Sequence, residues 1–190
     1  QGLLRETEAE ATSEKSVITP EFTQFTIDWL TISVLHNRFS ASTTIAGSFE
    51  PLADLVVGTF AVLAHTPVSA AGINFDFHYQ FTDAKHAKRI GDLLAPKDRW
   101  NPLLTNPISN TIAVEGTRPG SPSTTARITV QPLPALPGLH IGTNEHFVCA
   151  VEPVPVGPTG FMNLLSTEWP ECEKFASGAA DHIISQGRNE

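Results

Sequence analysis

The feature that most constrains this sequence is a strict alternation of apolar and polar residues from Gly72 to Phe81, GINFDFHYQF. Successive side chains of a β-strand point to opposite faces, so a period of two gives the strand one apolar and one polar face. The apolar set is Ile73, Phe75, Phe77, Tyr79 and Phe81, and the polar set is Asn74, Asp76, His78 and Gln80. We therefore predict a core strand with buried aromatic side chains. Gly72 suggests a close backbone approach or a positive φ at its start.

Two strands and a helix are predicted before this segment. The β-branched and aromatic residues of 23–35 predict one strand, and the Thr-rich residues 38–47 predict a second strand in a hairpin with it. Pro51 suits the first turn of a helix, and Ser48 is a candidate cap. Apolar residues then recur at helical spacing, which predicts that this helix ends near Ala64.

The next elements are a helix, a loop and a hairpin. Asp83 can cap a helix that runs through Leu94. Residues 95–107 contain three prolines and predict a loop, which we expect Trp100 to pin down. Strands at 111–117 and 125–131 flank the turn RPGSPS and predict a hairpin.

The last part of the chain is predicted to add a strand and a closing helix. Residues 132–140 are rich in proline, which has no amide to donate, so we expect an edge or crossing segment. Residues 146–152 predict a strand, and Thr167 is expected to cap the last helix. Regular βαβα alternation is absent, so the sequence predicts an α+β fold: a mixed, mainly antiparallel sheet with about three helices packed on it.

Composition favours one folded domain with a tail. Residues 1–16 carry four Glu and few large apolar residues, so we expect a flexible acidic arm. Residues 17–190 are expected to form a single globular domain, because 41% of the chain is hydrophobic and only 17% is charged.

The charge of the chain weighs against nucleic acid as a partner. The net charge is −8, and the basic stretch from Lys85 to Arg99 is accompanied by Asp83, Asp92 and Asp98, as in a solvated helix face. No run of about 18 apolar residues occurs, so no membrane partner is expected and we infer a cytoplasmic protein. The two cysteines, Cys149 and Cys172, are expected to be buried free thiols.

The sequence carries no complete motif of a known catalytic or nucleotide-binding site. It contains no GxxxxGK or GxGxxG loop, no complete GxSxG elbow and no HExxH pair, so no cofactor and no catalytic group are predicted. The best local candidate is the polar face of Asn74, Asp76 and His78, which could bind a ligand or metal and be completed by His146 or Glu145. An ordinary solvated strand face is the alternative explanation.

Trp100 is the other candidate. It lies in the loop DRWNP, where partial exposure would indicate a binding hot spot and burial a structural anchor.

Residues 65–81 (HTPVSAAGINFDFHYQF), 146–152 (HFVCAVE) and 168–185 (EWPECEKFASGAADHIIS) resemble a sporadically distributed family of uncharacterised bacterial α+β proteins. Gly72 and Asn74 are the matching positions, although Ile73 alone stands between them where the family usually has a basic residue and an aromatic one. The resemblance implies an α+β fold and an accessory role in mobile or defence-associated gene sets.

Three functions from different classes follow as hypotheses. The first is a non-enzymatic interaction or assembly protein that binds a protein partner or forms a homo-oligomer, through the sheet edge expected near residues 132–140. The second is a small ligand- or metal-binding protein or enzyme that uses the polar face of strand 72–81. The third is a phage or virion structural component.

Overall fold

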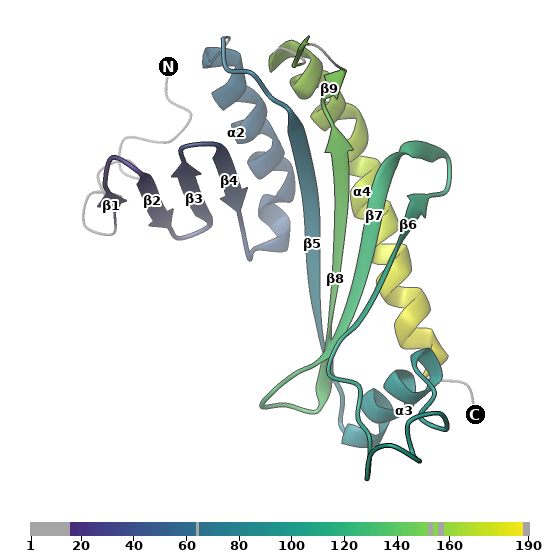
Figure 1. The fold of residues 1–190 in the computed structure, drawn as a ribbon. Coiled ribbons are helices and arrows are strands. Elements are labelled where there is room, and N and C mark those ends of the chain that lie inside the picture. Colours follow the sequence, from purple (N-terminus) through teal and green to yellow (C-terminus); the bar gives the residue numbers. More distant parts are fainter. Residues whose placement is uncertain (1–15, 64, 152–153, 156–157, 188–190) are drawn as a thin grey trace. The chain divides into compact units, whose positions relative to one another are not determined.

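A computed structural model describes residues 16–63, 65–151, 154–155 and 158–187 (Figure 1). The described residues form three α-helices and ten strands, and every strand pair is antiparallel. The predicted α+β class is therefore confirmed, with two four-stranded sheets. The expected arm at residues 1–16 lies outside the described residues except for Ser16. The chain divides into two compact units, Gln1–Pro67 with Val156–Ser166 and Val68–Pro155 with Thr167–Glu190.

The first unit contains a meander of four strands. They are β1 (Val17–Ile18), β2 (Phe22–Ile27), β3 (Leu30–Leu35) and β4 (Arg38–Ser42). The prediction of one strand over 23–35 was wrong, because Asp28 and Trp29 form a turn that pairs Ile27 with Leu30. Both halves have a strand composition, and composition alone does not locate a two-residue turn between them.

A helix supplies apolar side chains in this unit. After the 3₁₀ turn η2 (Ala46–Ser48), α2 runs over Phe49–Val62 and buries Leu52, Leu55 and Phe60. Ser48 occupies the cap position but its side chain makes no cap hydrogen bond. The Phe60 ring packs edge-on against Phe39 at 5.5 Å and against Phe161 at 4.8 Å between ring centres.

The second unit contains the long sheet. Its strands are β5 (Ala70–Gln80), β6 (Ile112–Arg118), β7 (Ser121–Pro132) and β8 (Gly138–Val148), in the order β5-β8-β7-β6. The short strands β9 (Ala150–Val151) and β10 (Val154–Pro155) pair with each other. The alternation in β5 is confirmed, since Ile73 and Phe75 are buried and the intervening polar residues are exposed. β5 lies at the end of this sheet.

Helices cover the apolar face of this sheet (Figure 1). As predicted, the Asp83 side chain accepts a hydrogen bond from the Lys85 amide and caps α3 (Ala84–Leu94). The C-terminal turns of α4 (Pro158–Gln186) pack against this sheet. One cluster of buried side chains joins α3, α4, β7 and β8: Ile90, Val130, Leu139, Ile141, Ala180, Ile183 and Ile184.

Two predictions in this unit were wrong. Residues 132–140 do not form a sheet edge: residues 133–137 are the turn between the inner strands β7 and β8, and Pro132 pairs with Leu139. The last residue pair between β6 and β7 at this end is Ile112 with Val130. Pro132 lies beyond this pair, so its lack of an N–H group does not interrupt the pairing of β6 with β7. The close backbone approach or positive φ expected at Gly72 is not found, because a Cβ added at this position would make only ordinary van der Waals contacts. The position that does require glycine is Gly138, where an added Cβ would collide with the Tyr79 carbonyl oxygen.

The last helix also differs from its prediction. α4 begins at Pro158 and not at Thr167, and Pro170 lies inside it. The sequence Thr-Glu-Trp-Pro resembles the start of a helix, where a capping side chain and an early proline are both favourable. This helix buries Cys172, Ala176 and Ile183.

Candidate functional site

The polar face of the long sheet brings together residues that are far apart in the sequence. Three pairs of directly opposed residues join β5 to β8: Asn74 with Asn144, Asp76 with Gly142, and His78 with His140. All six point away from the helices, because they belong to the polar halves of two alternating strands. Asn144, Gly142 and His140 were not predicted, since the strand was expected to begin only at His146.

The side chains of this face contact one another closely. His140 Nε2 lies 2.7 Å from Asp76 Oδ1, which is a hydrogen bond. The rings of His78 and His140 stack with their centres 4.9 Å apart and their planes at 28°. The Asn144 amide donates to the Asn74 side-chain oxygen at 2.5 Å. We name Asp76, His78 and His140 the imidazole–carboxylate cluster.

Gly142 makes room beside this cluster. A Cβ at this position would lie 3.0 Å from Asp76 Oδ1 and 3.4 Å from the His140 ring. The missing side chain leaves a shallow depression of about 220 Å³, bordered by Asn74, Asp76, Thr129, His140 and Asn144. The arrangement can place hydrogen-bonding groups around a small polar ligand.

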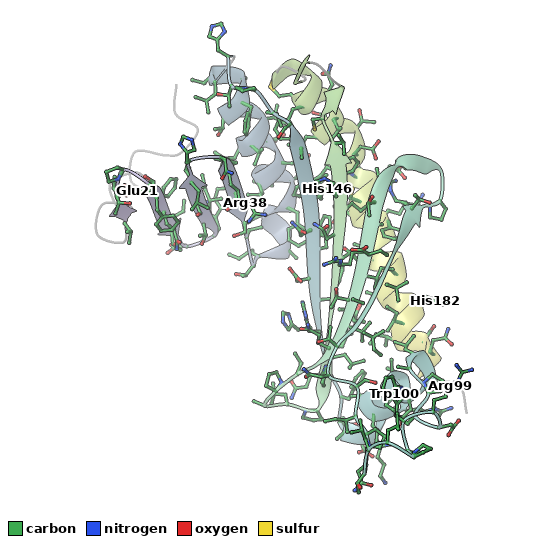
Figure 2. The ribbon with its side chains drawn as sticks, viewed as in Figure 1. Glu21, Arg38, Arg99, Trp100, His146 and His182 are labelled. Carbon is green, nitrogen blue, oxygen red and sulfur yellow. The ribbon has the colours of Figure 1, made fainter. Side chains whose placement is uncertain are left out.

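The two residues expected to complete this face do not join the cluster. His146 lies on the polar face opposite Gly72, six positions along β8 from His140, which is about 20 Å. Figure 2 shows His146 on the upper half of the sheet. Glu145 is adjacent to it but points to the opposite face, where it is 1% exposed. Glu145 therefore cannot contribute to the polar face.

Glu145 instead forms a buried ion-pair network that the sequence did not reveal. Arg118, at the end of β6, is 8% exposed, and its Nε donates to Glu145 Oε2 at 2.6 Å. The Arg118 guanidinium also donates to Glu168 of α4, and Glu171 lies 3.9 Å away. The sequence signal for the burial of Glu145 is the period of two in β8, where every second residue is buried. The buried series is Leu139, Ile141, Thr143, Glu145 and Phe147.

The network changes the acid–base properties of its members. Burial alone would lower the pKa of Arg118, but its bonds to Glu145 and Glu168 raise the pKa above its ordinary value. Burial raises the pKa of the Cys172 thiol, and the neighbouring Glu145 carboxylate raises it further. Cys149 and Cys172 are both free and buried, as predicted. The network therefore keeps the Arg118 guanidinium charged and the Cys172 thiol protonated.

Trp100 lies in an exposed apolar surface beside α3, at the lower end of Figure 2. Its side chain is 52% exposed, and Leu103 and Ile108 in the same loop are 73% and 82% exposed. We name the exposed apolar residues of this region the loop patch: Leu93, Leu94, Trp100, Leu103, Leu104 and Ile108. The prediction that Trp100 pins the loop down was wrong. Lys97 holds it, because its ammonium group donates to the Ala95 carbonyl and to Ser109 Oγ.

The basic residues predicted along α3 lie beside the loop patch. Lys85, Lys88, Arg89, Asp92 and Leu93 line an open hollow of about 340 Å³. Lys88 pairs with Asp92 at 2.6 Å, one helical turn away, as in the solvated helix face that we expected.

Comparisons with known proteins give no relative. No family model matches the chain, and neither a curated protein nor a solved structure matches it significantly. The resemblance to the sporadically distributed bacterial family stays a prediction. In the described part of the chain no helix is long and apolar enough to span a bilayer. Within those same residues no group of three or more His, Cys, Asp or Glu side chains is placed so that it could hold a metal ion.

Proposed function

We propose that this chain is a non-enzymatic interaction or assembly protein, and that the loop patch is its docking surface. The observation that carries the proposal is the exposure of Trp100 together with five large aliphatic side chains between residues 93 and 108. Contiguous exposed apolar surface is rare on monomeric proteins and marks interaction sites. Tryptophan is the side chain that most often dominates the energy of an interface.

The surroundings of the patch indicate the chemistry of the partner. Lys85 and Lys88 on α3 line a hollow with Leu93 and Asp92, and Arg99 lies beside Trp100 in the loop (Figure 2), in a chain whose net charge is −8. An apolar groove with acidic residues at its rim would match this surface, because opposite charges at a rim speed association and select the partner. The occupant that we propose is therefore a protein with such a groove.

The cellular context of this role is a further proposal. The resemblance of residues 65–81, 146–152 and 168–185 supports an accessory subunit of a bacterial multi-protein system, associated with defence or mobile elements and located in the cytoplasm. A homo-oligomer is the second form that the assembly could take.

A photo-crosslinking experiment tests the docking surface. Benzoylphenylalanine replaces Leu103 in one variant and Val114 in a control, because Val114 is an equally apolar residue of β6 that is 63% exposed and outside the patch. We expect one adduct of defined mass from position 103, none from position 114, and loss of the adduct when Trp100→Ser and Leu104→Ser are added. Mixing ¹⁵N-labelled and unlabelled chains distinguishes a second copy from another protein. Equal adducts at both positions, or a monomer without any adduct, would contradict the proposal.

A ligand-binding or enzymatic role for the polar face is the second candidate function. The hydrogen bond between Asp76 and His140 favours it, because a carboxylate that orients an imidazole occurs both in general bases and in metal ligands.

A further inference from the structure

We propose that the depression at Gly142 binds one ring of a neutral ligand rich in hydroxyl groups, of the class of a monosaccharide unit. The inference rests on the second candidate function, since it names the ligand class for the polar face, and it does not depend on the loop patch. All residues that border the depression belong to one compact unit and to the long sheet.

Gly142 forms the floor of the depression. It lies on the inner strand β8, opposite Asp76 of β5 on one side and opposite Thr129 of β7 on the other. Neighbouring strands are about 4.8 Å apart, so Asp76 and Thr129 stand on the two sides of an opening about 10 Å wide. A side chain at position 142 would fill this opening, whereas glycine leaves it to a ligand.

Polar side chains close the two ends of the opening and are held in place before a ligand arrives. Asn74 and Asn144 form one end, where the Asn144 amide donates to Asn74 Oδ1 at 2.5 Å. His140 forms the other end, and its Nε2 atom lies 2.7 Å from Asp76 Oδ1. Side chains that are already ordered lose less conformational entropy on binding, which favours even a small ligand.

The same side chains keep hydrogen-bonding capacity for a ligand. A carboxylate accepts at both oxygens, and a side-chain amide combines an NH₂ donor with an acceptor oxygen. The bonds to His140 and between the asparagines therefore leave acceptors at Asp76 Oδ2 and Asn144 Oδ1, and a donor at Asn74 Nδ2. Each hydroxyl group of a sugar both donates and accepts, so adjacent hydroxyls match a rim that contains donors and acceptors.

The lining disfavours the other classes of small ligand. The Asp76 carboxylate repels an anion, and an apolar ligand would leave the rim groups without hydrogen-bond partners. In the described part of the chain no group of side chains could hold a metal ion. The depression measures about 220 Å³, which is less than the roughly 300–1,000 Å³ of most ligand pockets, so it suits a single ring.

NMR titration of the ¹⁵N-labelled chain tests the ligand class. The probes are the methyl glycosides of glucose, mannose and galactose, and, for other classes, ethanolamine, acetate and adenosine. We expect at least one glycoside to move the backbone amide signal of Gly142 and the side-chain amide signals of Asn74 and Asn144. The shifts should saturate in the millimolar range, because the site is shallow and small.

Two variants and a matched control locate the site. Gly142→Val is expected to abolish saturable shifts, because its side chain occupies the depression while valine suits a strand. Asn74→Ala is expected to weaken binding roughly threefold or more, since it removes a donor from the rim. His146→Ala is the control, because His146 lies on the same strand and face as His140 and outside the depression. It should bind like the unaltered chain.

The melting temperature of each variant without ligand shows whether it is folded, and Asn74→Ala keeps the test decisive if Gly142→Val does not fold. Saturable binding of ethanolamine, acetate or adenosine without any glycoside would overturn the inference and support the second candidate function. Binding of none of the probes would overturn both. Unchanged affinity in a folded Gly142→Val or in Asn74→Ala would also overturn the inference, and so would an equal loss in His146→Ala.

Discussion

Arg118 and Arg127 each form an ion pair with a glutamate of the long sheet, but they differ in solvent exposure. Both donate to a glutamate at 2.6 Å, but Arg118 is buried and Arg127 is more than half exposed. An exposed ion pair contributes little, whereas removing one partner of a buried pair leaves an uncompensated charge.

We expect Arg118→Leu to lower the free energy of unfolding by about 3–5 kcal/mol, because the Glu145 carboxylate would remain buried without its partner. Arg127→Leu is the control and should cost less than about 1 kcal/mol. Urea denaturation measures both. The double variant Arg118→Leu/Glu145→Leu should recover part of the loss, since it removes both charges. Equal losses in the two single variants would show that the network has no special role.

Cys172 gives the molecule a dependence on alkaline pH. The folded state raises the pKa of this thiol, whereas an unfolded thiol releases its proton near pH 8.5. Above that pH the unfolded state binds fewer protons than the folded one, so stability falls as pH rises, by at most about 1.4 kcal/mol per pH unit for this group. Cys172→Ala should show a flatter fall between pH 8 and 10, measured by urea denaturation. The same slope in both proteins would assign the effect to other groups.

Among the elements, β5 separates most clearly into two faces. Phe75 is 5% exposed and packs against Trp169 at 5.6 Å, whereas His78 lies on the polar face. We expect Phe75→Ala to destabilise by about 3–5 kcal/mol and His78→Ala by well under 1 kcal/mol. Phe77, which is only partly buried, should fall between them. Thermal unfolding without metal ions measures all three. A loss at His78 comparable to that at Phe75 would mean that the polar face is packed against another part of the chain.

The sequence predicted the elements whose own residues repeat regularly. The alternation of β5 and the cap of α3 by Asp83 both act over a few residues, and both are confirmed. β8 was predicted too short, because Gly138, Gly142 and Asn144 suggest turns when they are taken alone. Their strand conformation depends on pairing with both β5 and β7, which local composition does not contain.

The candidate site was predicted only where its residues lie on an element with a regular local pattern. Asp76 and His78 were found because they lie on the strand with the clearest alternation. His140, the partner of both, was assigned to a proline-rich segment that the structure shows to be a hairpin turn entering β8. Glu145 was placed on the wrong face because the start of its strand was missed. Trp100 was a candidate only on condition of exposure, and its 52% exposure meets that condition.

At the scale of the whole molecule, the prediction of a single domain can be tested by its unfolding. A single domain is expected to unfold in one cooperative transition. Phe60→Ala and Ile141→Ala remove buried side chains from different compact units, and each should cost about 2–5 kcal/mol. We expect both variants to lower the same midpoint in scanning calorimetry. Two transitions, each moved by only one variant, would contradict the single domain.

The pairing of β5 with β8 sets the order in which the long sheet can assemble. β6, β7 and β8 follow one another through short turns, whereas Asn74 and Asn144 are 70 residues apart. Closing so long a loop costs about 2 kcal/mol more chain entropy than closing a hairpin, so β5 should dock last, onto strands already formed. In stopped-flow experiments Val130→Ala should then mainly slow refolding, and Phe75→Ala should mainly speed unfolding. The imidazole–carboxylate cluster joins β5 to β8, so it would come into existence only at the final step, and a chain still in the course of folding would present no such cluster.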